Sequence, residues 1–107
     1  MPELAAPRYR KNPVVKKLAA AAPALRLQYC VERIGLFGSF ARGEQKPGSD
    51  IDVLVEFAAG HATLKNFVGL ADHLEALFKR KVDLSTREGL DRYIRPHVEA
   101  EVIWVEG

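Results

Sequence analysis

Apolar residues follow two patterns along this chain, short continuous runs and a helical period, and each pattern predicts a different element. Residues 31–37 and 51–57 are short apolar runs followed by glycine within a few residues, which predicts two buried strands. Between residues 63 and 79, apolar side chains recur at three- and four-residue steps, which predicts an amphipathic helix. Shorter apolar runs predict two further strands at 81–84 and 102–105.

The first third of the chain predicts helices. Pro13 suits a first helical turn, and the apolar residues after it follow a rough helical period. Pro23 is expected to break this helix, so that residues 25–29 continue into a second short one. Another short helix is predicted to start near Ser39.

A last helix is predicted between the two final strands. Ser85 and Glu88 have the spacing of a capping box, in which each side chain satisfies a free backbone N–H at a helix start. Pro96 must kink or restart this helix because proline has no N–H to donate. The whole pattern predicts a single small α/β (α+β) domain, with helices packed on a mixed sheet of about four strands.

Length and composition fit one globular domain. The 107 residues are enough for a modest core, and no apolar run approaches the roughly 20 residues that span a bilayer. Cys30 is alone, so an intrachain disulfide is impossible and a reducing, cytoplasmic location is expected. We assign residues 1–12 to a flexible N-terminal segment and residues 13–107 to the folded domain.

The net charge of +2 conceals a basic leading segment. Residues 1–26 contain six lysines and arginines against one glutamate. Such a segment could contact nucleic acid or an acidic partner. We interpret it instead as a solvated helix face with a frayed end, so direct nucleic-acid binding is not expected.

The most informative positions are Gly38-Ser39 and Asp50-Ile51-Asp52. Glycine permits a tight turn and close approach of a phosphate to the backbone, and Ser39 adds a hydroxyl at a helix start. Asp50 and Asp52 are two residues apart, so both emerge from the same face of a strand. Adjacent carboxylates repel each other unless a cation lies between them, and oxygen ligands suit Mg²⁺ or Mn²⁺. A phosphate site beside such a metal site indicates phosphoryl or nucleotidyl transfer.

Asp83 is the candidate for the third carboxylate that a two-metal site requires. It lies within a short apolar strand, where a carboxylate is costly unless it has a function. This strand follows a helical crossover and can therefore lie beside Asp50 and Asp52 in the sheet. Two Mg²⁺ ions would then bind the triphosphate and activate the attacking hydroxyl, with Asp83 as general base.

Some of these residues also have structural interpretations. Asp50 could cap a turn, and Asp83 could pair with Lys81 or Arg87. The combination of three carboxylates with the glycine–serine turn favours a functional site. Three residues near Gly38-Ser39, which we call the phosphate turn, are weaker candidates for nucleotide binding: Arg42, Lys46 and Ser49.

Together, Gly38-Ser39, Asp50-Ile51-Asp52 and Asp83 resemble the motif of the polymerase-beta-type nucleotidyltransferase superfamily. The short length and the run from Gly38 to Gly43 resemble its minimal nucleotidyltransferase (MNT) branch, and the resemblance covers residues 31–105. It implies the polymerase-beta-like nucleotidyltransferase fold. It also implies that Asp50, Asp52 and Asp83 ligate Mg²⁺ and that Gly38 and Ser39 hold the phosphates of ATP.

Proteins of the MNT branch are typically antitoxins paired with an α-helical HEPN ribonuclease toxin. The resemblance therefore implies transfer of AMP from ATP to a tyrosine hydroxyl of such a toxin, within a hetero-oligomer. Three other hypotheses remain open. The protein could neutralise a toxin by non-covalent binding, modify a small molecule in the manner of aminoglycoside nucleotidyltransferases, or simply bind nucleic acid.

Overall fold

The computed structural model describes residues 12–105, which fold around one four-stranded sheet. The strands are β1 (Val31–Phe37), β2 (Ile51–Phe57), β3 (Val82–Thr86) and β4 (Ile103–Trp104). They lie in the order β3–β2–β1–β4. Strand β1 pairs antiparallel with β2 and β4, whereas β2 pairs parallel with β3. The predicted α/β fold with a mixed sheet is confirmed.

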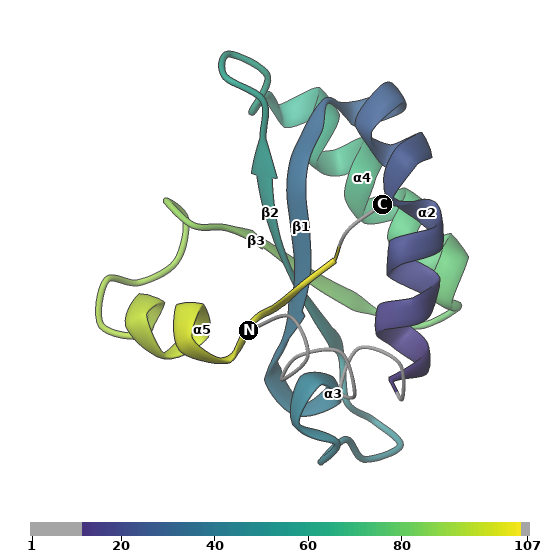
Figure 1. Ribbon diagram of the computed structural model, residues 1–107, viewed down its shortest axis with the longest axis vertical. Coiled ribbons are helices and arrows are strands. Elements are labelled where there is room, and N and C mark those ends of the chain that lie inside the picture. Colours follow the sequence, from purple (N-terminus) through teal and green to yellow (C-terminus); the bar gives the residue numbers. More distant parts are fainter. Residues whose placement is uncertain (1–11, 106–107) are drawn as a thin grey trace.

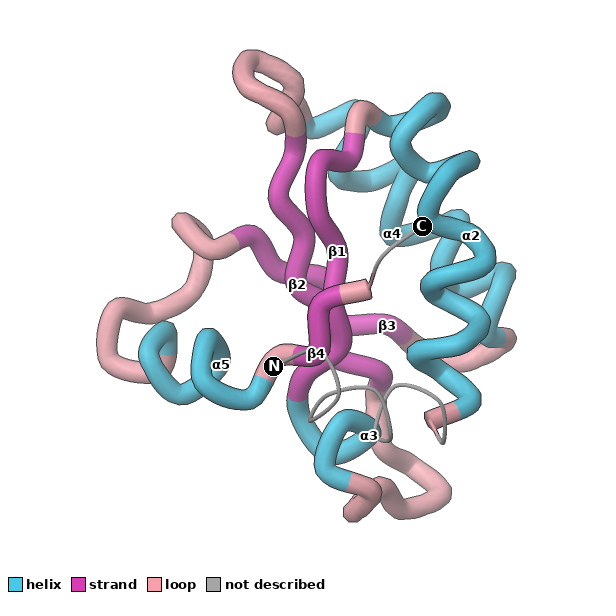
Figure 2. The backbone as a smooth tube through the Cα atoms, in the orientation of Figure 1, coloured by secondary structure: helices cyan, strands magenta, loops and turns pink. Residues whose placement is uncertain are grey.

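Two long helices cover one face of this sheet. Helices α2 (Pro13–Tyr29) and α4 (Leu64–Phe78) lie together on one side, and α5 (Arg95–Glu101) lies on the other (Figure 1). The short helix α3 (Gly38–Arg42) follows β1 directly, at the end of the sheet where β2 begins (Figure 2). Within the described residues, no helix combines the length and apolar character needed to cross a membrane.

The core fixes which face of each strand is available to a site. Val53 on β2 and Leu84 on β3 belong to the main core between the sheet and the α2–α4 layer. Leu54 belongs instead to a second cluster with Leu90 and Val98, beneath α5. Because successive strand residues point to opposite faces, the neighbours of Val53 and Leu84 project on the α5 side. Asp52 and Asp83 are such neighbours.

Helix α2 continues through Pro23, so the prediction that this proline breaks the helix is wrong. Four buried residues form one stripe along the 17-residue helix: Val15, Leu18, Ala22 and Leu25. Pro23 itself is exposed, and burial of Leu25 beyond it offsets the missing hydrogen bond. Of the segment predicted to be flexible, residues 1–11 lie outside the described part of the chain. Asn12 caps α2, because its Oδ1 accepts the Val14 N–H at 3.0 Å.

The helix predicted from the capping box at Ser85 and Glu88 does not form there. Ser85 and Thr86 instead extend β3, opposite Leu54 and Val55 of β2. Strand pairing within the sheet thus overrides the local capping signal. The next helix, α5, begins only at Arg95, and Pro96 lies in its first turn, as expected of a proline that restarts a helix.

Candidate active site

The register of the sheet places two of the predicted carboxylates side by side. Phe37 at the end of β1 pairs with Asp52 on β2, and Asp52 pairs with Asp83 on β3. Adjacent strands lie about 4.8 Å apart, so the two aspartates are neighbours on the α5 side of the sheet. Gly38 follows Phe37 directly and begins α3, which lies at this same end of the sheet (Figure 1).

The backbone of Gly38 packs directly against the Asp52 carboxylate. Its φ of +76° lies in the left-handed region, which glycine adopts without strain. A Cβ atom at this position would lie 2.1 Å from Asp52 Oδ2, so no larger residue fits without displacing the carboxylate. This contact joins the two halves of the motif, Gly38-Ser39 and Asp50-Ile51-Asp52.

The Asp52 carboxylate has an unusual charge environment. Its pKa is raised from 3.8 to about 6, first by burial and then by the negative charge of Asp83. The charges of Asp50 and Glu101 raise the pKa further, and the positive charge of Arg42 lowers it. Asp50, which directly precedes β2, is therefore close enough to belong to the same negative cluster.

The three carboxylates lack an ion-pair partner among the described residues, although the charge of Arg42 acts on Asp52 without direct contact. Asp50, Asp52 and Asp83 form no ion pair with any residue in the range 12–105. Asp83 does not pair with Arg87, because Arg87 pairs with Glu99 on α5. The interpretation of Asp83 as half of a structural ion pair is therefore not supported.

The donor set fits a hard divalent cation. Unpaired carboxylate oxygens are the ligands that Mg²⁺ prefers, and a cation would relieve their mutual repulsion. Across the described range, however, no three His, Cys, Asp or Glu side chains are gathered tightly enough to form a complete metal site. The three aspartates are neighbours rather than a closed cage, which suits an ion that keeps water and phosphate oxygens among its ligands.

The loop before Asp50 is held in place by Arg80, a residue that sequence analysis did not single out. Arg80 Nη1 donates hydrogen bonds to the carbonyl oxygens of Ser49 at 2.9 Å and Pro47 at 3.0 Å. The Ser49 hydroxyl accepts the Lys46 N–H at 2.9 Å and so closes the turn. In this structure Ser49 shapes the loop, and its predicted contact with nucleotide stays a prediction.

Arg42, another of the three weaker candidates for nucleotide binding, is engaged by two glutamates. Its guanidinium donates to Glu44 Oε1 at 2.9 Å and to Glu101 Oε1 at 2.9 Å. Hydrogen bonds to Glu44 and then to Glu101 raise the pKa of Arg42. Glu101 also accepts the Gly38 N–H, at 2.8 Å. Sequence analysis missed Glu101 as a site residue, because its approach to Gly38 depends on how the distant β4 pairs with β1.

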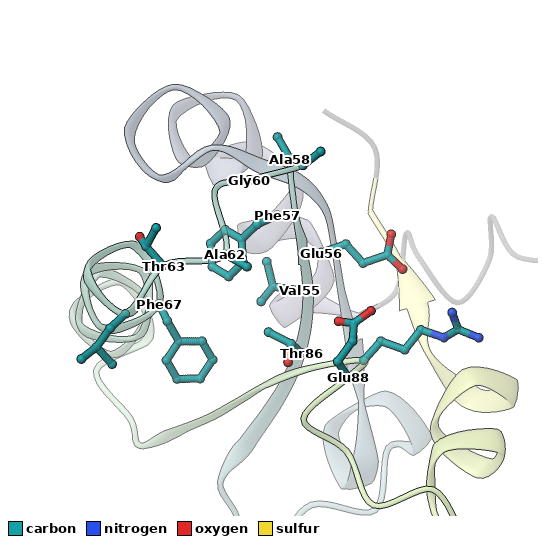
Figure 3. Close-up of a pocket in the computed structure, with 13 residues that line it drawn as sticks. Val55, Glu56, Phe57, Ala58, Gly60, Ala62, Thr63, Phe67, Thr86 and Glu88 are labelled. Atoms are coloured by element: carbon teal, nitrogen blue, oxygen red, sulfur yellow. The ribbon is translucent and has the colours of Figure 1, made fainter.

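The surface has two hollows, of which one includes a candidate residue in its lining and the other does not. One of about 810 Å³ lies at the far end of β2, and Phe57, Thr63 and Phe67 are among its lining residues (Figure 3). None of the predicted site residues lines it. Another of about 640 Å³ lies between the start of α2 and α3, and Arg42 is among its lining residues. Asp50 and Asp52 are half-buried and Asp83 is exposed.

Comparison with known proteins shows the family of this chain. A family model, described as a nucleotidyltransferase domain, matches residues 15–105. The protein adenylyltransferase MntA of Thermococcus cleftensis is 42% identical over 88 residues, which make up 82% of this chain and 88% of MntA. The predicted motif therefore lies within a region shared with a known enzyme of this kind.

Two solved structures share the fold. One, described as a minimal nucleotidyltransferase, has a TM-score of 0.71 and 35% identity, over 83% of this chain and 90% of that one. The other comes from a toxin–antitoxin crystal structure with AMP-PNP. It has a TM-score of 0.67 and 25% identity, over 83% of this chain and 73% of that one. From sequence, fold and assembled motif alike, the chain belongs to the nucleotidyltransferase domain family.

Proposed function

We propose that this protein is an antitoxin that transfers AMP from ATP to a hydroxyl group of a partner toxin. The observation that carries the proposal is the contact between Gly38 and Asp52, with Asp83 paired beside Asp52 in the sheet. This contact joins a phosphate-binding turn to a cluster of unpaired carboxylates. Nucleotidyl transfer requires both features within reach of one triphosphate.

The residues of the site have distinct proposed roles. Asp50, Asp52 and Asp83 would hold Mg²⁺, and two ions are expected because a third carboxylate beside the first two provides a ligand for a second metal. When bound, the metal supplies positive charge that stabilises the triphosphate and the transferring phosphoryl group. Gly38 allows a close approach to the Asp52 carboxylate, and Ser39 presents its hydroxyl and backbone to the phosphates.

The proposed reaction is an in-line displacement at the α-phosphorus of ATP. The acceptor oxygen forms a bond to this phosphorus while the bond from phosphorus to the bridging oxygen of the β-phosphate breaks, so pyrophosphate leaves. The proton of the acceptor hydroxyl passes to the carboxylate of Asp83, the proposed general base. Asp83 suits this role because it is the most exposed of the three carboxylates and can be reached by an acceptor.

The acceptor is proposed to be a tyrosine on a toxin of the HEPN ribonuclease class. Support comes from MntA, which is a protein adenylyltransferase, and from the structural neighbour in a toxin–antitoxin crystal structure. The described part of this chain has no second domain that could bind a small acceptor molecule. An added phosphodiester would place a bulky anion where the toxin must bind RNA phosphate, which would block its activity.

The proposal is tested by incubating the protein with labelled ATP, MgCl₂ and a candidate toxin of the HEPN class, the product of a neighbouring gene, and then measuring the intact mass of both proteins. We expect the toxin to gain the mass of one or more AMP groups. The double variant Asp50→Ala/Asp52→Ala should abolish the gain. Asp72→Ala, which removes an exposed aspartate on α4, should leave it intact.

Two results would contradict the proposal in different ways. If the double variant still neutralises the toxin in cells, binding alone is sufficient and adenylylation is not the antitoxin mechanism. If the wild-type protein binds the toxin tightly but transfers no AMP to it, the protein is a binding antitoxin.

A further inference from the structure

Glu101, at the C-terminal end of α5, reaches the turn that begins α3. Strand β4 follows Glu101 and pairs antiparallel with β1, with Ile103 opposite Leu36. Continuing this register by two residues brings Glu101 opposite Gly38. The fold therefore delivers a carboxylate from the end of the chain to the phosphate turn, although the two residues are 63 positions apart.

The Glu101 carboxylate bridges the first and last residues of α3. Its Oε2 accepts the Gly38 N–H at 2.8 Å, and Arg42 Nη1 donates to Oε1 at 2.9 Å and to Oε2 at 3.2 Å. The N-cap residue Phe37 provides no side-chain hydrogen bond to the helix start. Glu101 thus satisfies a backbone donor that would otherwise lack a partner at this helix end.

The hydrogen bonds of Glu101 in this structure all go to the two ends of α3. Both of its oxygens are already engaged by Gly38 or Arg42. The bond to Gly38 is partly buried, whereas the bonds to Arg42 are exposed, so the contact with Gly38 is the one better shielded from water. Glu101 therefore acts on the site through the residues that it holds.

The orientation of the Gly38 peptide matters because Asp52 lies against it. Gly38 leaves no space for a Cβ atom beside Asp52 Oδ2, so a rotation of this turn would displace the carboxylate. The same rotation would move Ser39, the next residue in α3. A bond that fixes the Gly38 N–H consequently fixes the spacing between the phosphate turn and the carboxylates.

We propose that Glu101 is a positioning residue for the nucleotide, an inference that rests on the proposed nucleotidyl-transfer function. It holds Gly38 and Arg42 in the arrangement that receives the phosphates, and it touches neither the metal nor the reacting atoms. Removing its carboxylate should weaken the binding of ATP specifically. Binding of the protein acceptor should not change.

The test compares four proteins: the wild type, Glu101→Ala, Glu101→Gln and the control Glu99→Ala. Glu99 is another glutamate of α5, but it pairs with Arg87. Binding of a non-hydrolysable ATP analogue in MgCl₂ is measured by calorimetry, and AMP transfer is measured at varied concentrations of ATP and of acceptor. Thermal unfolding of each variant shows whether it is folded.

We expect Glu101→Ala to raise the Kd for the analogue and the KM for ATP by on the order of tenfold, because a charged hydrogen-bonded bridge is lost. The KM for the acceptor should stay at the wild-type value. Glu101→Gln keeps an oxygen that can accept the Gly38 N–H, so it should recover most of the affinity. Glu99→Ala should bind the analogue like the wild type.

Several outcomes would overturn the inference. These are wild-type nucleotide affinity in both Glu101 variants, or an equal loss in Glu99→Ala, or an equal rise in both KM values. If Glu101→Ala does not fold, Glu101→Leu, which fills the space without an acceptor for the Gly38 N–H, replaces it, and wild-type nucleotide affinity in that variant would overturn the inference. The proposed function fails separately, because wild-type protein that transfers no AMP contradicts adenylylation whatever the calorimetry shows.

Discussion

Gly38 allows the Asp52 carboxylate to pack against the backbone because glycine has no side chain. Its φ is positive, and its Cα lies against the Asp52 carboxylate. Gly43, at the other end of α3, has a similar φ of +73°, yet no atom lies within 4 Å of a Cβ built there. The two glycines therefore share a backbone requirement, but only Gly38 has a packing requirement as well.

This difference leads to a paired prediction for Gly38→Ala and Gly43→Ala. A positive φ costs an L-residue roughly 1–2 kcal/mol, so both variants should lose about that much free energy of unfolding in urea. Gly38→Ala should lose more, and it should also abolish AMP transfer because the Cβ displaces Asp52. Gly43→Ala should retain transfer. Equal rates of AMP transfer in the two variants would show that the close contact between Gly38 and Asp52 is not needed for transfer.

At the scale of elements, the sequence predicts best where several local signals agree. The strands at 31–37 and 51–57 have the predicted bounds, because an apolar run and a following turn both specify them. The prediction of a helix starting at Ser85 is wrong, since the capping-box spacing of Ser85 and Glu88 is a weak local signal. Pairing of Ser85 with Leu54 in the sheet outweighs it.

The presence or absence of a local signal also explains which candidate site residues can be predicted from the sequence. The motif residues Gly38, Asp50, Asp52 and Asp83 are identifiable because their spacing is local or lies within apolar strands. Glu101 and Arg80 have no such local signal. Their positions follow from how β4 pairs with β1 and how the turn after α4 meets the loop before Asp50. Such long-range contacts cannot be obtained from periodicity.

Helix α2 gives a prediction at the same scale. Pro23 lies inside the helix and is exposed, so its ring removes a hydrogen bond without contributing to the core. Pro23→Ala should therefore raise the free energy of unfolding by about 1–3 kcal/mol in urea titration. Pro13→Ala is the matched control: Pro13 lies in the first turn of α2, where no hydrogen bond is lost, so stability should barely change. A loss of stability in Pro23→Ala would mean that the ring packs usefully.

At the scale of the whole molecule, the main core lies on one side of the sheet and the candidate site lies on the other. Helices α2 and α4 cover the main core, whereas α5 covers the opposite face only in part (Figure 1). Three aspartates with no ion-pair partner among the described residues lie at one end of this second face. Folding brings their charges together, so the site itself should lower the stability of the domain when no cation is bound.

Because Asp52 titrates, the loss of stability caused by the repulsion among the carboxylates depends on pH. The unfolded chain releases the Asp52 proton near 3.8, whereas the folded protein retains it up to about 6. The folded state therefore binds more protons between these values, and its stability should fall as the pH rises through this window. Asp52→Asn should remove this part of the pH dependence. At pH 8 it should stabilise the metal-free protein by about 1 kcal/mol, a value reduced for the exposed part of the carboxylate.

Bound Mg²⁺ should restore the stability that the metal-free protein loses as the pH rises. At pH 8, Mg²⁺ at ten times its Kd should add about 1.4 kcal/mol of stability, measured as a rise in Tm with MgCl₂ and its reversal by EDTA. At pH 5 the rise should be much smaller, because a proton on Asp52 competes with the cation. Asp52→Asn should show no rise at either pH, whereas Asp72→Ala on α4 should behave as the wild type. A rise in Tm that persists in Asp52→Asn would place the cation elsewhere and remove Asp52 from the proposed ligands.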